Sequence, residues 1–157
     1  MPPTVIIEPS SLDFSRVLLS REEIGKFNPQ RFEFQLLDGV VLMDHEARKY
    51  AGYYDAREDA WWVRGHIPGR PIMPGVVMIE CAAQMASLVA HHLLDDLGFL
   101  GFSGVSDVKF RGVVTPPARF ILVGQALEVK RRRVICATQG FVDGEMVYEG
   151  VITGMPI

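Results

Sequence analysis

The chain has 157 residues, of which 48% are hydrophobic and 22% are charged, and it carries a formal net charge of −3 at pH 7. This length suits one domain with a genuine core, and the composition excludes a disordered chain. General nucleic-acid binding needs a basic excess that this chain lacks, so we expect no nucleic-acid partner. We therefore expect a single domain over residues 1–157.

Residues 1–19 show no regular pattern and are expected to form an irregular leader. They have neither the basic start nor the long apolar stretch of a secretory signal, which favours a cytoplasmic protein. Ser20 and Glu23 then have the spacing of a capping box. This pattern predicts a short helix that Asn28 and Pro29 would close.

Two strands are predicted in the next part of the chain. Residues 32–36 alternate between apolar and polar side chains, which is typical of a half-buried strand. Residues 49–56 are rich in tyrosine, a residue that favours strands. His45 lies between them, where we expect a surface turn.

A long apolar helix is predicted over residues 76–94. Its few polar side chains recur at steps of four, three and four residues, namely Glu80, Gln84, Ser87 and His91. These steps follow the helical period, so the four side chains form one stripe. Because the helix is otherwise apolar, we expect it in a core or an interface, where a carboxylate is costly unless it is partnered or used. Glu80 is therefore a candidate functional residue.

Other readings of this helix are less favourable. Glu80 near its start and Asp95 and Asp96 after its end argue against a membrane span. His91 and His92 point to different faces and have no paired-ligand spacing, so no metal site is predicted. Its methionines, and Met73 before it, most simply fill a core.

The second half of the chain predicts an antiparallel meander. Strands are expected over residues 105–114, 120–129 and 134–142, and the basic run 130–133 should form a solvated hairpin tip. Asp143 and Gly144 are a strong signal for a type I′ hairpin turn. Cys136 in this meander and Cys81 in the helix lie far apart, so both are expected to be small buried side chains without a disulfide. Strands packed on one long helix predict an α+β domain.

The loop before the helix supplies a second functional candidate. His66 lies in a run rich in glycine and proline, and histidine suits proton abstraction near neutral pH. Glu80 can act as the matching acid if burial keeps it partly protonated. Gly75 lies where the helix begins, so its backbone N–H can stabilise negative charge on a substrate oxygen. Gln84, one turn beyond Glu80, can orient the carboxyl group.

Residues 65–84, GHIPGRPIMPGVVMIECAAQ, resemble the β-hydroxyacyl-acyl carrier protein dehydratases, the FabZ/FabA type of hot-dog-fold enzyme. The positions that agree with the family pattern are Gly65, His66, Pro68, Gly69, Pro71, Ile72, Met73, Pro74, Gly75, Val76, Glu80, Ala83 and Gln84. Two weaker patches, residues 28–38 and 108–116, are similar to family strands on either side of the central helix. The resemblance covers about residues 24–154.

The chain departs from the family pattern at several places. Ile67 replaces the usual aromatic residue after the histidine, and Gln30 and Glu33 replace a histidine and a proline. Pro117 and Ala118 stand where the family often has Gly-Asp. These changes leave His66 and Glu80 intact and bear on substrate preference.

The resemblance implies a hot-dog fold, an antiparallel sheet curled around the long helix. It implies dehydration of a (3R)-3-hydroxyacyl-acyl carrier protein to the trans-2-enoyl product in fatty acid biosynthesis, without a cofactor. His66 would be the base, and Glu80 of the partner chain the acid or the ligand of the hydroxyl. The backbone carbonyl of Ile72 would fix the histidine tautomer. Glutamate at position 80, where isomerising members tend to have aspartate, favours a plain dehydratase.

The same resemblance implies partners. The acyl chain would arrive on the 4′-phosphopantetheine arm of an acyl carrier protein, and the enzyme would be a homodimer or a trimer of such dimers. An acidic carrier needs a local basic rim. The candidate rim residues are Arg64, Arg70, Lys109, Arg111, Arg119 and the run 130–133.

Two other functions stay open at this point. A hot-dog acyl thioesterase is the nearest enzyme, although its signature would lack the Gly-His and Pro-Gly pattern that leads to Glu80. A non-catalytic acyl-binding or assembly subunit is the second alternative. An intact His66 and Glu80 count against it, because a binding role has no need for an acid/base pair.

Overall fold

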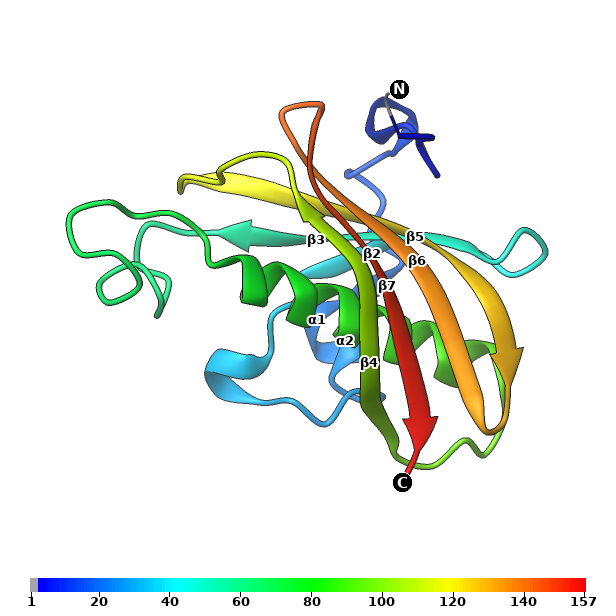
Figure 1. Cartoon of the computed structure of the whole chain (residues 1–157). Helices are drawn as coiled ribbons and strands as arrows, with labels where there is room; N and C mark the ends of the chain where they lie inside the picture. The colour runs from blue at the N-terminus through cyan, green and yellow to red at the C-terminus, as the bar shows by residue number, and fades with distance from the viewer. Residues whose placement is uncertain (1–2) are drawn as a thin grey trace.

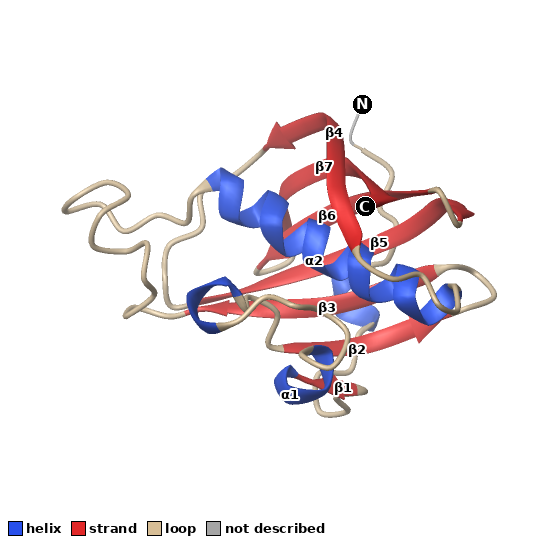
Figure 2. Ribbon diagram, turned by 90° about the horizontal axis from the view of Figure 1, so that it is seen from below, coloured by secondary structure: helices blue, strands red, loops and turns tan. Residues whose placement is uncertain are grey.

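A computed structural model describes residues 3–157 of the chain. These residues form a seven-stranded antiparallel sheet in the order β1-β2-β3-β5-β6-β7-β4, which curves around the long helix α2 (Figures 1 and 2). The strands are β1 (Leu19–Ser20), β2 (Gly39–Asp44), β3 (Lys49–Ala56), β4 (Leu100–Phe110), β5 (Ala118–Lys130), β6 (Arg133–Val142) and β7 (Glu145–Pro156). The helices are α1 (Arg21–Ile24), α2 (Gly75–Leu93) and the 3-10 turns η1 (Pro9–Ser11) and η2 (Phe32–Phe34). The predicted α+β class is confirmed.

Helix α2 occupies the concave side of the sheet, within one residue of its predicted bounds at each end. The predicted methionines are buried there: Met73, Met78 and Met85 are each at most 4% exposed. By length and hydropathy α2 would also pass as a membrane span, but 56% of that window is buried inside the fold, as in the core helix of a soluble domain. Its apolar character is thus explained by packing against the sheet.

The meander β5-β6-β7 has the predicted turns. Asp143 and Gly144 have φ angles of 50° and 80°, the positive values that a type I′ turn requires at both positions. Arg131 and Arg132 form the exposed tip between β5 and β6. Cys81 and Cys136 are buried free thiols, as expected.

The strand predicted over residues 32–36 is wrong. Residues 32–34 form the 3-10 turn η2, and residues 35–38 belong to no strand. The physical reason is a side chain of α2: Gln84 Nε2 donates to the carbonyl of Phe34 at 2.7 Å, and Gln84 Oε1 accepts from the amide of Leu36 at 3.3 Å. These backbone groups are bonded to a helix side chain instead of a neighbouring strand.

Three further elements differ from the prediction. Strand β2 was not predicted, because its run Val-Val-Leu-Met lacks the alternation of a half-buried strand. The strand predicted over 105–114 begins at Leu100 and ends at Phe110. Beyond it the carbonyl of Val114 accepts from Met73, so the chain turns toward the start of α2. Helix α1 has the predicted capping box but ends at Ile24, before residue 28.

The leader is irregular apart from η1 and packs on the sheet face opposite α2 (Figure 1). Gln139 on β6 holds it, since its side chain accepts from Ile6 N at 2.8 Å and donates to Thr4 O at 2.7 Å. The leader therefore covers the part of this face around Ala51, Val123 and Phe141. Residues 1–2 of the predicted leader lie outside the described residues.

Candidate active site

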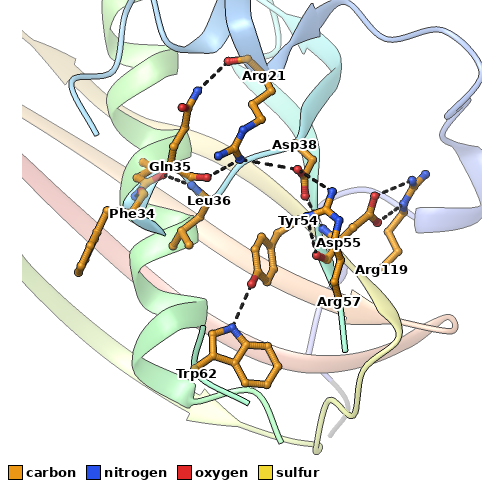
Figure 3. A network of polar contacts seen from close by, with 11 residues as sticks. Arg21, Phe34, Gln35, Leu36, Asp38, Tyr54, Asp55, Arg57, Trp62 and Arg119 are labelled. Carbon is orange, nitrogen blue, oxygen red and sulfur yellow. Dashed lines mark hydrogen bonds and ion pairs between the residues drawn. The ribbon is translucent and has the colours of Figure 1, made fainter. Parts of the chain in front are cut away.

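His66 lies in a long loop, residues 57–74, that projects from the body between β3 and α2 (Figure 1). The loop is attached at Trp62, which is only 2% exposed and whose Nε1 donates to the hydroxyl of Tyr54 at 3.0 Å (Figure 3). The backbone N–H of His66 in turn donates to the carbonyl of Trp62 at 3.0 Å. A buried aromatic side chain thus positions the histidine, although the histidine itself is exposed.

A charge network secures the point where this loop leaves β3 (Figure 3). Asp38 accepts from the backbone of Asp55 at 2.7 Å and pairs with Arg57 at 3.2 Å. Arg119 donates twice to the Asp55 carboxylate, at 2.7 and 3.0 Å. The hydrogen bond to Asp38 raises the pKa of the Arg57 guanidinium. These contacts fix the position of the first residues of the loop.

The imidazole of His66 is held in one tautomer. Its Nδ1 lies 3.0 Å from the carbonyl oxygen of Ile72, further along the same loop. A carbonyl oxygen can only accept, so Nδ1 carries the hydrogen and a neutral ring leaves Nε2 free to take up a proton. This is the contact that the family resemblance implies for Ile72.

Glu80 is held by the residue one turn beyond it. Its Oε1 accepts from Gln84 Nε2 at 2.9 Å, and Gln84 is 3% exposed. The carbonyl of Gln84 accepts from Asn28 Nδ2 at 2.9 Å. Asn28 was not singled out from the sequence except as a helix end, and no local pattern reveals a bond across 56 residues.

A cavity of about 380 Å³ runs along α2 beside Glu80. All four members of the predicted polar stripe line it: Glu80, Gln84, Ser87 and His91. Its other walls come from residues 27–30, residues 98–102 and the sheet ends near Val134 and Ile152. The helical spacing that predicted a single stripe therefore identified one wall of the cavity.

His66 and Glu80 of the same chain are not brought together. No residue of the loop 57–74 lines the cavity at Glu80. His66 is exposed and its one side-chain hydrogen bond within residues 3–157 is the contact with Ile72. The candidate acid/base pair is thus not formed within a single chain.

Gly75 is the first residue of α2 and lies under the ring of Phe110. A Cβ at this position would lie 2.6 Å from the ring, closer than real side chains approach. Phe110 is 51% exposed and comes from the end of β4. Sequence reasoning missed Phe110, because only the fold brings the end of β4 to the start of α2.

The remaining candidate residues lie outside this site. His45 is exposed in the turn between β2 and β3, as expected. Of the predicted basic rim, Arg119 pairs with Asp55, and Arg111 pairs with Glu149 at 2.9 Å. Arg133 and Lys130 both pair with Glu128.

A model of the FabA-like domain family matches residues 28–151. The chain belongs to the FabA-like domain family. The match spans the loop with His66, the helix with Glu80 and most of the sheet, so the site described above lies inside the family domain.

Solved structures of similar fold carry more than one activity in their names. The dehydratase heterocomplex ApeI:P from Xenorhabdus doucetiae superposes with a TM-score of 0.71 at 13% identity, covering 85% of this chain and 90% of that chain. A mutant thioesterase from Pseudomonas aeruginosa has a TM-score of 0.67 at 14% identity, covering 90% and 98%. A hypothetical thioesterase with coenzyme A from Streptococcus pneumoniae TIGR4 has a TM-score of 0.64 at 10% identity, covering 88% and 97%. At these identities the likeness shows the hot-dog fold alone.

Proposed function

We propose that this FabA-like domain dehydrates a (3R)-3-hydroxyacyl thioester to the trans-2-enoyl thioester, with an acyl carrier protein as the carrier. The observation that carries the proposal is that the side chains of His66 and Glu80 are each held in one orientation. His66 has Nδ1 bonded to Ile72 and Nε2 open, and Glu80 is held by Gln84 at the wall of a cavity. An oriented base and an oriented carboxyl group are what the elimination of water requires.

In the proposed reaction, His66 Nε2 removes the α-proton and the electron pair of that C–H bond moves toward the thioester. Negative charge gathers on the thioester oxygen, where the N–H of Gly75 and the positive end of α2 stabilise it. The C–O bond at the β-carbon then breaks as Glu80 gives its proton to the departing hydroxyl, which leaves as water. The proton taken by His66 restores Glu80, so no cofactor is consumed.

The proposed site is formed by two copies of the chain, with His66 of one protomer facing Glu80 of the other. Among residues 3–157, no residue of the loop 57–74 lines the cavity at Glu80. This supports a site that two chains share. Strand β4 is at the edge of the sheet, so one side of its backbone has no partner strand in the chain. Its exposed apolar side chains and that of Val76, 72% exposed, suit a two-fold interface.

Arg64 and Arg70 support an acidic carrier as the partner. Both are exposed on the loop that carries His66, so they flank the proposed entrance to the site. Positive charge at this place would attract the acidic surface of an acyl carrier protein.

A thioesterase is the second candidate, because two of the similar structures above are named as thioesterases. Its reaction would release a free thiol, whereas dehydration forms a conjugated enoyl thioester. A non-catalytic subunit would do neither.

One assay separates these functions. The protein is mixed with 3-hydroxyacyl thioesters of acyl carrier protein and of coenzyme A, and enoyl absorbance and free thiol are followed in parallel. We expect enoyl product without thiol release, and loss of that product in His66→Ala and in Glu80→Gln. Thiol release without enoyl product would replace the proposal by the thioesterase.

A further inference from the structure

The cavity continues well past Glu80. Helix α2 rises about 1.5 Å per residue, so Ser87 lies roughly 10 Å and His91 roughly 16 Å beyond Glu80 along the helix axis. Both residues line the cavity, opposite the apolar side chains of Phe99, Phe102 and Ile152. An acyl chain that reacts at Glu80 would therefore extend along a wall with further polar groups.

Ser87 has an uncommitted hydroxyl. A serine within a helix commonly bonds the carbonyl of the preceding turn. Within residues 3–157 the Ser87 hydroxyl forms no hydrogen bond, whereas its backbone carbonyl accepts from His91. The hydroxyl of this half-buried side chain is thus available to an occupant of the cavity.

Gln30 supplies a second uncommitted group, from a different segment. It lines the same cavity, and its side-chain oxygen is buried without a hydrogen-bond partner in the described part of the chain. A buried amide oxygen without a partner has lost its hydrogen bond to water and has formed no other hydrogen bond in its place. Gln30 is also one of the positions where the chain departs from the family pattern.

The ring nitrogens of His91 are not available to an occupant of the cavity. Its Nδ1 lies 2.8 Å from the carbonyl of Ser87, and its Nε2 lies 2.8 Å from the carbonyl of Gly98. Both ring nitrogens face backbone oxygens that can only accept. The imidazole therefore lies between the end of α2 and the segment that leads into β4, at the wall of the cavity.

We propose that this cavity selects acyl groups that carry a hydroxyl group toward their far end over plain alkyl chains of equal length. The inference rests on the proposed function, because it places the reacting end of the substrate at Glu80. A hydroxyl both donates and accepts, so it matches the Ser87 hydroxyl and the Gln30 amide. A plain alkyl chain would cover the Ser87 hydroxyl and would leave the Gln30 oxygen without a partner, as it already is.

The test measures binding, which does not depend on turnover. Acyl pantetheine analogues with an amide in place of the thioester are made in two series, alkyl chains of increasing length and the same chains with a terminal hydroxyl in place of the last methyl group. Calorimetry gives the Kd of each for the dimeric protein. At the length that reaches Ser87, we expect the hydroxyl analogue to bind about five-fold more tightly, the usual net effect of one hydrogen bond.

Two variants and a matched control locate the effect. Ser87→Ala should abolish the preference without weakening the binding of alkyl analogues, because alanine is a good helix former. Gln30→Leu should reduce the preference and strengthen alkyl binding. Ser10→Ala, at an exposed serine of η1, should keep the wild-type preference.

Equal binding of the two series at every length would overturn the inference, as would a preference that survives both variants or a failure of both series to bind. The outcome is separable from that of the enoyl assay. Enoyl product without a hydroxyl preference rejects this inference alone. A hydroxyl preference without enoyl product rejects the dehydratase and keeps the assignment of the cavity.

Discussion

The contact between His66 and Ile72 fixes the orientation of the exposed imidazole. The ring is attached through one nitrogen to a backbone carbonyl, so its second nitrogen has a fixed direction. The orientation comes from the loop and the buried Trp62, and the second ring nitrogen, the proton acceptor of the proposed reaction, remains at the surface. Because the side chain of His66 is exposed, it can be removed without loss of core packing.

His66→Ala should lower kcat by roughly 10²–10⁴, the usual contribution of a positioned acid/base group. The melting temperature should change little, because the side chain is exposed. Steady-state formation of the enoyl thioester and a thermal melt measure the two effects. His45→Ala, another exposed histidine, is the control and should keep wild-type turnover. Near-native activity in folded His66→Ala would remove His66 from the mechanism.

Gly75 has a proposed catalytic role and a steric requirement, since a Cβ there would meet the ring of Phe110. Gly75→Val should lower kcat by about 10²–10³, the typical effect of losing one oxyanion donor, since the side chain blocks the carbonyl of the substrate. It also collides with the ring of Phe110. The double variant Gly75→Val, Phe110→Ala removes that collision and should remain slow. Recovery of normal turnover in the double variant would mean that the ring, and not the oxyanion contact, explains the glycine.

At the scale of elements, Gln84 connects α2 to the segment that precedes β2. Its amide group bonds Phe34 O, Leu36 N and Glu80, so one side chain satisfies two backbone groups and orients the carboxyl. The segment has no strand neighbour for these groups. Gln84 is therefore one of the contacts that hold this segment over the helix, together with the buried side chains of Leu36 and Leu37.

Gln84→Leu should destabilise the fold by about 2–4 kcal/mol, since it leaves buried backbone groups without partners. It should also lower kcat, because Glu80 loses its orienting hydrogen bond. Chemical denaturation and the enoyl assay measure these effects. Gln125→Leu removes one long bond to Ala47 O at 3.4 Å and is the matched control, with a small expected change. An unchanged unfolding free energy in Gln84→Leu would contradict this account.

These elements also show what the sequence can and cannot predict. Helix α2, strand β3 and the turn at Asp143 were predicted because each depends on local periodicity or turn chemistry. The segment 32–36 has the period of a strand, but its neighbour is the side chain of Gln84, which lies far along the chain. Phe110 over Gly75 is likewise a contact between distant segments. Local pattern predicted candidate site residues in one helix and one loop, and the tertiary contacts of each came from the fold.

The hairpin between β5 and β6 has a pH dependence of its own. Hydrogen bonds from Arg133 and Lys130 lower the pKa of Glu128 from 4.5 to about 2. Because the folded pKa is depressed, the contribution of this carboxylate to stability is present above pH 4.5 and is lost as the pH falls toward 2. An NMR titration of the Glu128 carboxyl should show the low midpoint. In Arg133→Ala the midpoint should rise toward 4.5, and an unchanged midpoint there would exclude Arg133 as the cause.

At the scale of the whole molecule, the strand β4 forms a long edge of the sheet. Helix α2 packs on one face and the leader on part of the other, while β4 presents an unpaired edge with Phe102, Val105 and Phe110 exposed. A long apolar edge of this kind favours pairing with another chain. The loop with His66 projects from the body and does not line the cavity at Glu80, so in the proposed dimer the two-fold partner would bring its His66 to each cavity.

Subunit mixing tests that arrangement. The homodimers of His66→Ala and of Glu80→Gln should each be nearly inactive. When the two are refolded together and pair at random, about half of the dimers are mixed. In a mixed dimer one site carries both lesions and the other carries neither, so about a quarter of wild-type activity should return. A site formed within one chain would keep a lesion in every copy. Mixed dimers verified by differential tagging, with no recovered activity, would therefore reject the shared site.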